Sequence, residues 1–544
     1  MPTLRQNHVL LGRICFGVML AGVLTLVAGC PSDRSTDSAG PTTAAEEGNA
    51  NDSDSPASDS PDEEPKPKPL LADWEAPAVA IVLTGEQHGH LEPCGCSERQ
   101  SGGLSRRADF VRQLRDRGWP VTGFDLGGLL KRTRRQSEMK FEVTRDALNT
   151  IGYQGLGLGP EDLRLGAEFL FTSFSNTSNE SGFDLPFIAS NVTIFQTREI
   201  GTPLTHRVVE VDGVKIGVTA VLSETYRTEL FPDGESPDSS LLQIDDPADV
   251  LPGVITQLKD EGSDVMLLLA YAKPDESRSL AEAYPDFDLV VTAGGPEDPV
   301  GDTEPVGDSL LLRVGTNGKN VAVVGYYPDA TEGDKYRFEV VELDRFRFGH
   351  STEIDDRMRA YQQLLESENL VANEPAITPD RGAEYSFIGS EKCADCHDSE
   401  YEVWEESHHH QYGFKSLTVA FAQTSDDPSL VERVRMDRIF DPECICCHTA
   451  GWDPQEVVRF ESGFVGAEES AHLTGVHCEN CHGPASKHVE LEESGDTDEV
   501  ALQAEREKMH VSVETAEVQV CHKCHDHENS PDFEFDKYWE QIAH

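Results

Sequence analysis

Basic residues are scarce in this chain of 544 residues, which has 45 lysines and arginines against 99 aspartates and glutamates and a formal net charge of −54. This balance repels phosphate backbones and anionic membrane surfaces, so we expect no nucleic-acid partner. The acidic charge could serve to bind a basic protein partner, or it could simply keep a protein outside the cytoplasm soluble. The chain also exceeds what one hydrophobic core usually supports, so at least two domains are expected.

The apolar run near the N-terminus is too short to span a bilayer, which takes about 20 residues. It extends from Ile14 to Ala28, follows Arg5 and Arg13, and leads into Val27-Ala-Gly-Cys30. Residues 1–30 therefore resemble a bacterial lipoprotein signal in which Cys30 is acylated. The alternatives are a plain signal peptide or a short uncleaved anchor. We expect an exported protein, periplasmic or at the cell surface, that Cys30 anchors to a membrane.

Large apolar residues are almost absent from Pro31 to about Pro69, where Ser, Asp, Glu, Pro, Thr and Ala dominate. A segment of this composition cannot bury enough surface to fold. We interpret residues 31–75 as a disordered acidic tether.

The next segment alternates apolar runs with turn residues. A hairpin is expected over residues 208–221, turning at Asp212-Gly213, and Ala108, Val111 and Leu114 share a helical face. Residues 76–348 are therefore predicted to form an α/β domain with mixed sheets covered by helices. Buried strands are predicted at residues 78–83, 121–126, 265–269, 289–292, 310–314 and 321–326.

Residues 349–385 are predicted to be a connector helix and a linker. Four apolar residues lie on one helical face, and Thr352 and Asp355 occupy capping-box positions. Pro375 and Pro379 then interrupt the helical pattern. The apolar residues are Ile354, Met358, Tyr361 and Leu365.

The last segment, residues 386–544, contains four copies of Cys-x-x-Cys-His. Two thiols three positions apart can bind the vinyl groups of one porphyrin, while the adjacent imidazole binds its iron. We therefore predict four covalently attached c-type haems in a mainly helical or irregular cytochrome domain. Cys446, inside the second copy, has the wrong offset from the histidine and is interpreted as a free thiol. The motif residues are Cys393, Cys396 and His397; Cys444, Cys447 and His448; Cys478, Cys481 and His482; and Cys521, Cys524 and His525.

Around these motifs the segment resembles the tetrahaem cytochrome c family of the cytochrome c-554/c-prime type. The resemblance lies in Tyr401-x-x-Trp404-x-x-Ser407-His-His409, in residues 475–488, and in residues 530–544. It implies His409, His488 and His544 as distal iron ligands.

We assign His488 to the third motif, His544 to the fourth, and the run His408–His410 to the first, with either neighbour of His409 as an alternative ligand. The second motif, with His448, is left as the candidate open centre. His472, His477, His510, His522 and His527 are held in reserve.

The α/β segment resembles calcineurin-like metallophosphoesterases of the 5'-nucleotidase type. The likeness begins at Leu83-Thr-Gly-Glu-Gln-His88 and continues through residues 124–128, 153–162, 186–192 and 213–221. The family binds two metal ions, but most ligand positions differ here. His88 is kept, and the altered positions are Glu86, Gly128, Pro160, Glu161, Ala270-Tyr271 and residues 295–298.

Without a bridging carboxylate, phosphatase chemistry is expected to be absent, and we expect no second metal in this domain. The alternative is an oxygen-rich site for a hard cation. It would consist of Glu86, Glu161, Asp162, Glu297 and Asp298. Cys94-Gly-Cys96 could be a strained disulfide, a soft-metal site, a redox relay or a structural turn.

The sequence thus predicts an extracytoplasmic multihaem cytochrome that relays electrons between redox partner proteins. Two other functions stay open. One is reduction of small nitrogen or oxygen species at a five-coordinate haem, and the other is metal-dependent hydrolysis of nucleotides.

Overall fold

The computed structural model describes residues 69–93, 100–175, 185–198, 202–232, 241–299, 301, 303–331, 334–426, 428–495 and 498–544. The predicted signal with Cys30, most of the predicted tether, and Cys94-Gly-Cys96 lie outside these residues. From Lys66 to His544 the chain forms one compact unit. Within the described part, no helix is both long and apolar enough to cross a bilayer.

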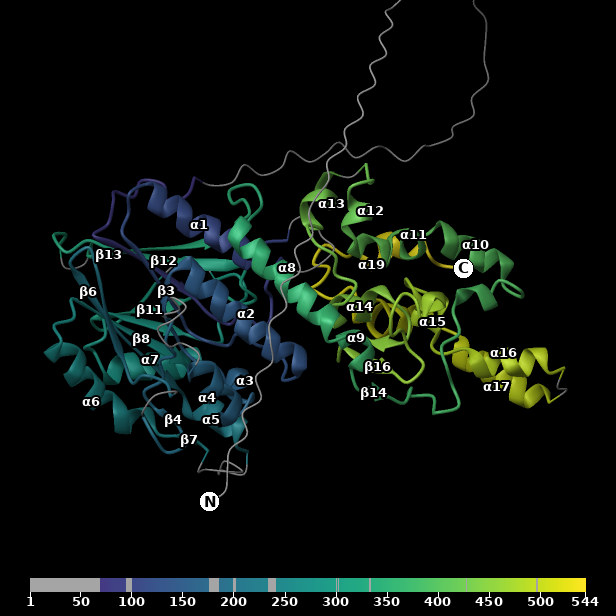
Figure 1. Ribbon diagram of the computed structural model, residues 1–544, viewed down its shortest axis with the longest axis horizontal. Helices are drawn as coiled ribbons and strands as arrows, with labels where there is room; N and C mark the ends of the chain where they lie inside the picture. Colours follow the sequence, from purple (N-terminus) through teal and green to yellow (C-terminus); the bar gives the residue numbers. More distant parts are fainter. Residues whose placement is uncertain are drawn as a thin grey trace, which may run out of the picture. The chain divides into compact units, whose positions relative to one another are not determined.

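The first sheet has five strands in the order β13-β12-β1-β2-β3. Figure 1 labels three of them, β13, β12 and β3. β1 pairs in parallel with β2 and antiparallel with β12, so the sheet is mixed, as predicted. Three of its strands coincide with predicted apolar runs. The bounds are Val79–Thr84 for β1, Val121–Asp125 for β2, Tyr153–Leu156 for β3, Asn320–Tyr326 for β12 and Tyr336–Glu342 for β13.

The second sheet has six strands in the order β10-β11-β9-β8-β6-β5. The predicted hairpin is confirmed: β5 and β6 pair antiparallel, and Asp212 and Gly213 between them have φ of 49° and 85°. Positive φ at both central residues matches the twist of the flanking strands. The bounds are Arg207–Val211 for β5, Val214–Leu222 for β6, Val265–Tyr271 for β8, Leu289–Thr292 for β9, Glu304–Val306 for β10 and Ser309–Arg313 for β11.

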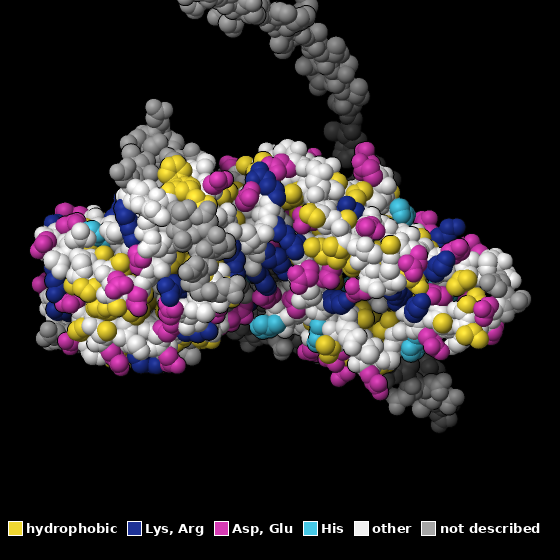
Figure 2. Space-filling view, turned by 90° about the horizontal axis from the view of Figure 1, so that it is seen from below, with side chains coloured by type: hydrophobic (Ala, Val, Ile, Leu, Met, Phe, Trp, Pro, Cys, Tyr) yellow, Lys and Arg dark blue, Asp and Glu magenta, His cyan; other side chains and the backbone are white. Residues whose placement is uncertain are grey.

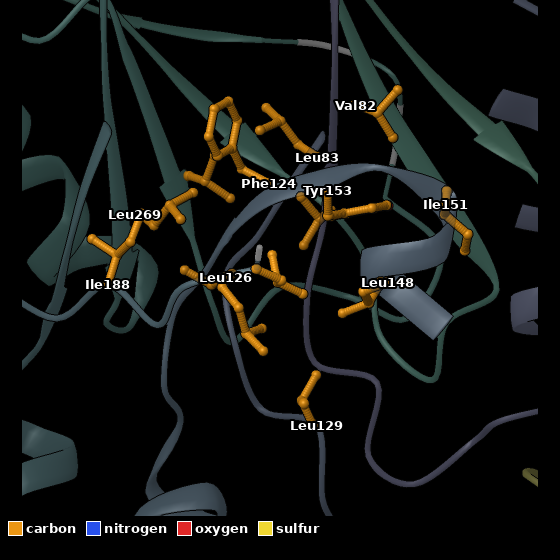
Figure 3. Close-up of a cluster of buried hydrophobic side chains, with 14 of the residues drawn as sticks. Val82, Leu83, Phe124, Leu126, Leu129, Leu148, Ile151, Tyr153, Ile188 and Leu269 are labelled. Carbon is orange, nitrogen blue, oxygen red and sulfur yellow. The ribbon is translucent and has the colours of Figure 1, made fainter. Parts of the chain in front are cut away.

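The main core joins the two sheets. Figure 3 shows side chains from β1, β2, β3 and helix α2 together with Leu269 of β8. Along β8, Val265, Leu267 and Leu269 belong to this core, whereas Met266 and Leu268 belong to a second cluster with helix α6. The strand is therefore buried on both faces, which explains its continuous apolar sequence.

Helices α1, α2 and α8 pack on one another, α1 and α2 also pack on the first sheet, and α6 and α7 pack on the second. Mixed sheets covered by helices are thus confirmed. The bounds are Leu104–Asp116 for α1, Arg135–Ile151 for α2, Pro247–Asp260 for α6, Pro274–Ala283 for α7 and Thr352–Ser367 for α8.

Helix α8 is part of the α/β core and not a free connector. Its predicted apolar face is confirmed, because Ile354, Met358, Tyr361 and Leu365 are all buried in the main core. The predicted capping box is wrong. Ser351 precedes the helix without a side-chain cap, and Asp355 instead accepts a hydrogen bond from Ser105 Oγ at 2.8 Å.

The cytochrome segment consists of short helices joined by turns, as predicted. Its apolar cluster is small and gathers around Ile445, Trp452 and Phe464. Helix α9 (Leu370–Asn373) lies in the linker before this segment. The helices of the segment are α10 (Asp398–Glu406), α11 (His408–Tyr412), α12 (Val419–Ala422), α13 (Pro428–Arg433), α14 (Pro442–His448), α15 (Cys478–His482), α16 (Ser486–Glu493), α17 (Glu499–Met509), α18 (Val513–Gln519) and α19 (Phe535–Trp539).

The remaining elements are short. Helices α3, α4 and α5 and the β4–β7 pair belong to the α/β part, and a small sheet of β14, β16 and β15 lies beside the second motif. Their bounds are Pro160–Leu163, Ala167–Ser175, Glu224–Leu230, Val192–Ile194, Leu242–Ile244, Ala376–Ile377, Val458–Phe460 and Trp452–Asp453; the 3₁₀ turns η2 to η5 are Ser390–Lys392, Lys415–Leu417, Ala471–Leu473 and Cys521–Lys523.

Candidate haem centres and the altered phosphoesterase face

Each Cys-x-x-Cys-His motif forms one helical turn. The second and third motifs lie in α14 and α15. In the first and fourth motifs, the backbone N–H of the histidine donates to the backbone carbonyl of the first cysteine. The distances are 2.9 Å for His397 and Cys393 and 2.9 Å for His525 and Cys521. One turn places both sulfurs and the imidazole on the same side of the backbone, as attachment to a single porphyrin requires.

Three motif histidines each face a second imidazole. The ring centroids are 6.4 Å apart for His397 and His488, 5.8 Å for His482 and His544, and 6.1 Å for His525 and His409. Two axial imidazoles with metal–nitrogen bonds of about 2 Å have their ring centres about 6 Å apart. The residues present therefore fit a haem iron between the rings of each pair.

The structure corrects the predicted pairing of these histidines. His488 lies beside the first motif and not the third, His544 beside the third and not the fourth, and His409 beside the fourth and not the first. The reason is tertiary. Ser486, at the start of α16, hydrogen-bonds to Ser386, so the helix after the third motif returns to the chain before the first.

Within the histidine run, only His409 faces a motif histidine. His410 packs edge-on against Trp404 at 4.3 Å, and His408 packs against Tyr412 at 4.9 Å. Burial lowers the pKa of His409 to about 4, which keeps its imidazole neutral and able to bind a metal.

Backbone and hydroxyl acceptors fix the motif imidazoles. Nδ1 of His448 lies 2.6 Å from the Gly413 carbonyl, Nδ1 of His482 lies 2.6 Å from the Met509 carbonyl, and Nδ1 of His525 lies 3.2 Å from Ser530 Oγ. These contacts leave Nε2 of each ring for iron. The predicted open centre at His448 stays a prediction.

Sequence reasoning missed the two residues between the cysteines of the third motif. The Glu479 carboxylate accepts from the backbone N–H groups of Ile388 and Gly389, which precede the first motif. Asn480 Nδ2 donates to the Thr449 carbonyl, which follows the second motif, at 2.9 Å. The polar character of both residues was the only sign of this role in the sequence. Through these hydrogen bonds, the third motif is linked to the first and the second.

His477, one of the reserve histidines, has a structural role. Its Nδ1 accepts from the Ser390 N–H at 3.1 Å, and its Nε2 lies 3.2 Å from the Thr474 carbonyl. Burial lowers its pKa to about 4. Another reserve, His527, pairs with Glu297 of the α/β domain at 3.2 Å.

Motif cysteines from distant parts of the sequence contact one another. Cys393 contacts Cys478, and Cys447 contacts Cys524. The free thiol of Cys446 lies beside Cys447, with the two sulfurs 3.9 Å apart. In the loaded protein the motif sulfurs would be thioethers, so the attachment points of two haems would lie side by side at each contact between motifs. These contacts bring the first motif against the third and the second against the fourth.

On the α/β face, a tyrosine fills the space around two glycines. A Cβ on Gly128 would lie 2.7 Å from Tyr271 Oη, and a Cβ on Gly159 would lie 2.9 Å from its Cε2. The aspartate expected at position 128 in the resembled family would therefore collide with this ring. The glycine at position 128 and the tyrosine at position 271 therefore depend on each other in this structure.

The structure does not bring the five acidic candidates into one site. Among the described residues, no three His, Cys, Asp or Glu side chains converge as a metal site would require. Asp162 accepts from the N–H groups of Gly128, Leu129 and Gly159, and burial raises its pKa to about 7. The partners of the others are Gly294 N–H for Glu86, Arg164 for Glu161, Asn317 and Lys319 for Glu297, and Asn320 for Asp298.

His88 and Glu86, the first two positions of the altered site, are both poorly solvated. Burial raises the pKa of Glu86 to about 7, and the hydrogen bond from the Gly294 N–H offsets part of this rise. Burial also lowers the pKa of His88, opposed by its hydrogen bond with Asn317. Burial therefore favours the neutral form of each side chain.

These features define a c-type cytochrome joined to an α/β domain with an altered metallophosphoesterase-like face. Residues 392–483 match the family model "Cytochrome c554 and c-prime". Cytochrome c-554 of Nitrosomonas europaea is 28% identical over 102 residues, which cover 19% of this chain and 40% of that protein. The predicted resemblance is confirmed, and a match to this family implies covalently bound c-type haem.

The α/β domain has its own relatives. The 5'-nucleotidase of Diplobatis ommata is 24% identical over 268 residues, which cover 48% of this chain and 42% of that protein. A 5'-nucleotidase precursor from Thermus thermophilus has a TM-score of 0.45 and 16% identity, over 55% of this chain and 61% of that one. The chain spans about two fifths of each curated relative it matches.

Proposed function

We propose that this protein is an exported tetrahaem cytochrome that relays electrons between redox partners. The observation that carries the proposal is the set of three facing histidine pairs, each joining a motif histidine to one of His409, His488 and His544. An imidazole on both faces of the iron suits electron transfer, because it holds the metal in one geometry in both oxidation states.

The cysteine contacts support transfer between centres. Contacts of the first motif with the third, and of the second with the fourth, support two close haem pairs. When bound, the haems supply the reversible one-electron chemistry. The chain's own residues hold the imidazoles, keep the motifs together through Glu479 and Asn480, and exclude water around the second motif.

Partners and location belong to the same proposal. The net charge of −54 supports a basic redox partner. Acidic side chains are spread over the visible face without forming one patch (Figure 2), so the charge also serves solubility. Lipidation of Cys30 would hold the protein at a membrane outside the cytoplasm.

The α/β domain serves as a scaffold in this proposal and not as a hydrolase. The ring of Tyr271 beside Gly128 supports this role, because it leaves no room for a carboxylate at that position. We expect no phosphate release from AMP by protein supplied with divalent metal. Release that His88→Ala abolishes would overturn the scaffold role.

A spectroscopic redox titration of the mature protein tests the electron-relay function. We expect four haems per chain by haem content and intact mass, four reversible one-electron reductions, and low-spin signatures from the three paired centres. Fewer than four haems, or high-spin signatures from the centres of His397, His482 and His525, would overturn the proposal.

A further inference from the structure

The helix that carries the second motif begins at a contact with the α/β domain. Asp441 caps α14, and its Oδ1 accepts from Nε2 of Gln136, on α2, at 2.7 Å. Its Oδ2 accepts from Nε2 of Gln362, on α8, at 3.1 Å. Gln136 also donates to Tyr361 Oη at 2.9 Å. The orientation of α14 is thus set by two helices of the α/β core.

A charged pair lies one turn further along α2. Lys140 Nζ donates to the Glu443 carboxylate and, at 2.8 Å, to the Gly89 carbonyl. The Lys140 side chain is 8% exposed and that of Glu443 is 39% exposed. Glu443 directly precedes Cys444, which attaches the second haem. The Lys140 ammonium is held out of water, so it acts on that porphyrin with less solvent screening than an exposed charge would.

Among the described residues, no lysine or arginine of the α/β domain as buried as Lys140 forms an ion pair beside another motif. The ion pair between Lys131 and Glu528, near the fourth motif, is 41% and 35% exposed. Arg381, which donates to the His482 carbonyl of the third motif, comes from the linker. The Lys140–Glu443 pair is therefore specific to the second motif.

We propose that helix α2 of the α/β domain tunes the second haem: Lys140 and Gln136 hold the first turn of α14 and set the midpoint potential of that one centre. This inference rests on the proposed electron-relay function. It gives the altered phosphoesterase domain a role in redox chemistry, with Lys140 and Gln136 as positioning residues.

The sign of the effect follows from the charges. Lys140→Met leaves the Glu443 carboxylate without its cation beside the porphyrin, which favours the oxidised haem and lowers its midpoint potential. Glu443→Gln removes the anion and raises the potential. The double variant removes both charges and returns the potential towards that of the wild type, which a purely structural disturbance would not do.

The experiment is a redox titration of the holoprotein, resolved into four components, for these variants. One component should change its reduction equilibrium constant by about tenfold, as expected for a unit charge about 10 Å away at an effective dielectric constant of about 20. Arg135→Met is the matched control, because Arg135 is on the same helix but pairs with Glu368. It should shift no component.

Lys131→Met should shift a different component by less than about twofold, since the Lys131 side chain is 41% exposed, against 8% for Lys140. Equal shifts of all four components, or none in either single variant, would overturn the inference. If Lys140→Met fails to fold, Glu443→Gln alone tests the inference, which predicts a higher midpoint potential for one component of this variant. Four components whose midpoint potentials are the same in the variants and the wild type would refute the tuning but not the electron-relay function. Fewer than four components in the wild type would refute the electron-relay function itself.

Discussion

The two halves of this protein build their interiors from different materials. The α/β domain has a continuous core of aliphatic and aromatic side chains that joins two sheets and the helices packed on them. The cytochrome segment has one small apolar cluster, beside the second motif, and facing imidazoles at the other three. Side-chain burial stabilises the first half, and we expect the cofactors to provide most of the interior of the second.

The largest expected effect separates the halves completely. Protein produced without haem attachment should have residues 386–544 unfolded, because ligands that bind only the folded state contribute their binding energy to folding. The α/β domain should stay folded. Hydrogen exchange read by mass spectrometry would show fast exchange after residue 386 and protection in β1, β8 and α2. Equal protection of both halves from hydrogen exchange would show that the cytochrome segment does not depend on haem for folding.

A cavity in the α/β core should have the next largest effect. Leu269 is fully buried between the sheets (Figure 3), so Leu269→Ala should cost about 2–5 kcal/mol. Thermal unfolding followed by circular dichroism would measure the loss, and the haem absorption spectrum of the native protein should not change. Leu364→Ala, at a position 39% exposed, is the control and should have little effect.

The buried carboxyl of Glu86 should make the stability of the α/β domain depend on pH. Burial raises its pKa to about 7, so stability present below about pH 4.5 is lost as the pH rises to 7. Glu86→Gln should therefore stabilise the domain by up to about 3 kcal/mol at pH 8 and by almost nothing at pH 4. Denaturant unfolding at both pH values would measure this difference. The same change at exposed Glu210 should leave the pH profile as it is.

The smallest effect on folding should come from a distal histidine. His488→Ala should convert only the haem of the first motif from low to high spin, because His488 faces His397. Electron paramagnetic resonance of the oxidised protein would show one low-spin signal lost, with His472→Ala, at an exposed position, as the control. Loss of the signal that belongs to His482 instead would restore the pairing predicted from sequence.

Local features were predictable from the sequence. Strands such as β8 and β12, the Asp212-Gly213 turn and the apolar face of α8 follow from periodicity and turn chemistry within a few residues. The four motifs follow from covalent chemistry. In each case the residues that decide the structure are neighbours in the chain.

Long-range relations were not predictable in the same way. The assignment of His488 to the third motif was wrong because the return of α16 to Ser386 leaves no trace in local spacing. The capping box at Thr352 was wrong because Asp355 takes part in tertiary contacts with Ser105 and Arg435. The hydrogen bonds of Gln136 and Lys140 to α14 could not be predicted, because they join residues about 300 positions apart in the chain.

The close approach of Tyr271 to Gly128 has a consequence for protein engineering. An aspartate placed at position 128 would meet the tyrosine ring, so the residue at position 271 has to become smaller as well. A histidine placed at position 271 alone would find no carboxylate opposite it. A pair of metal ligands at these two positions therefore requires both substitutions.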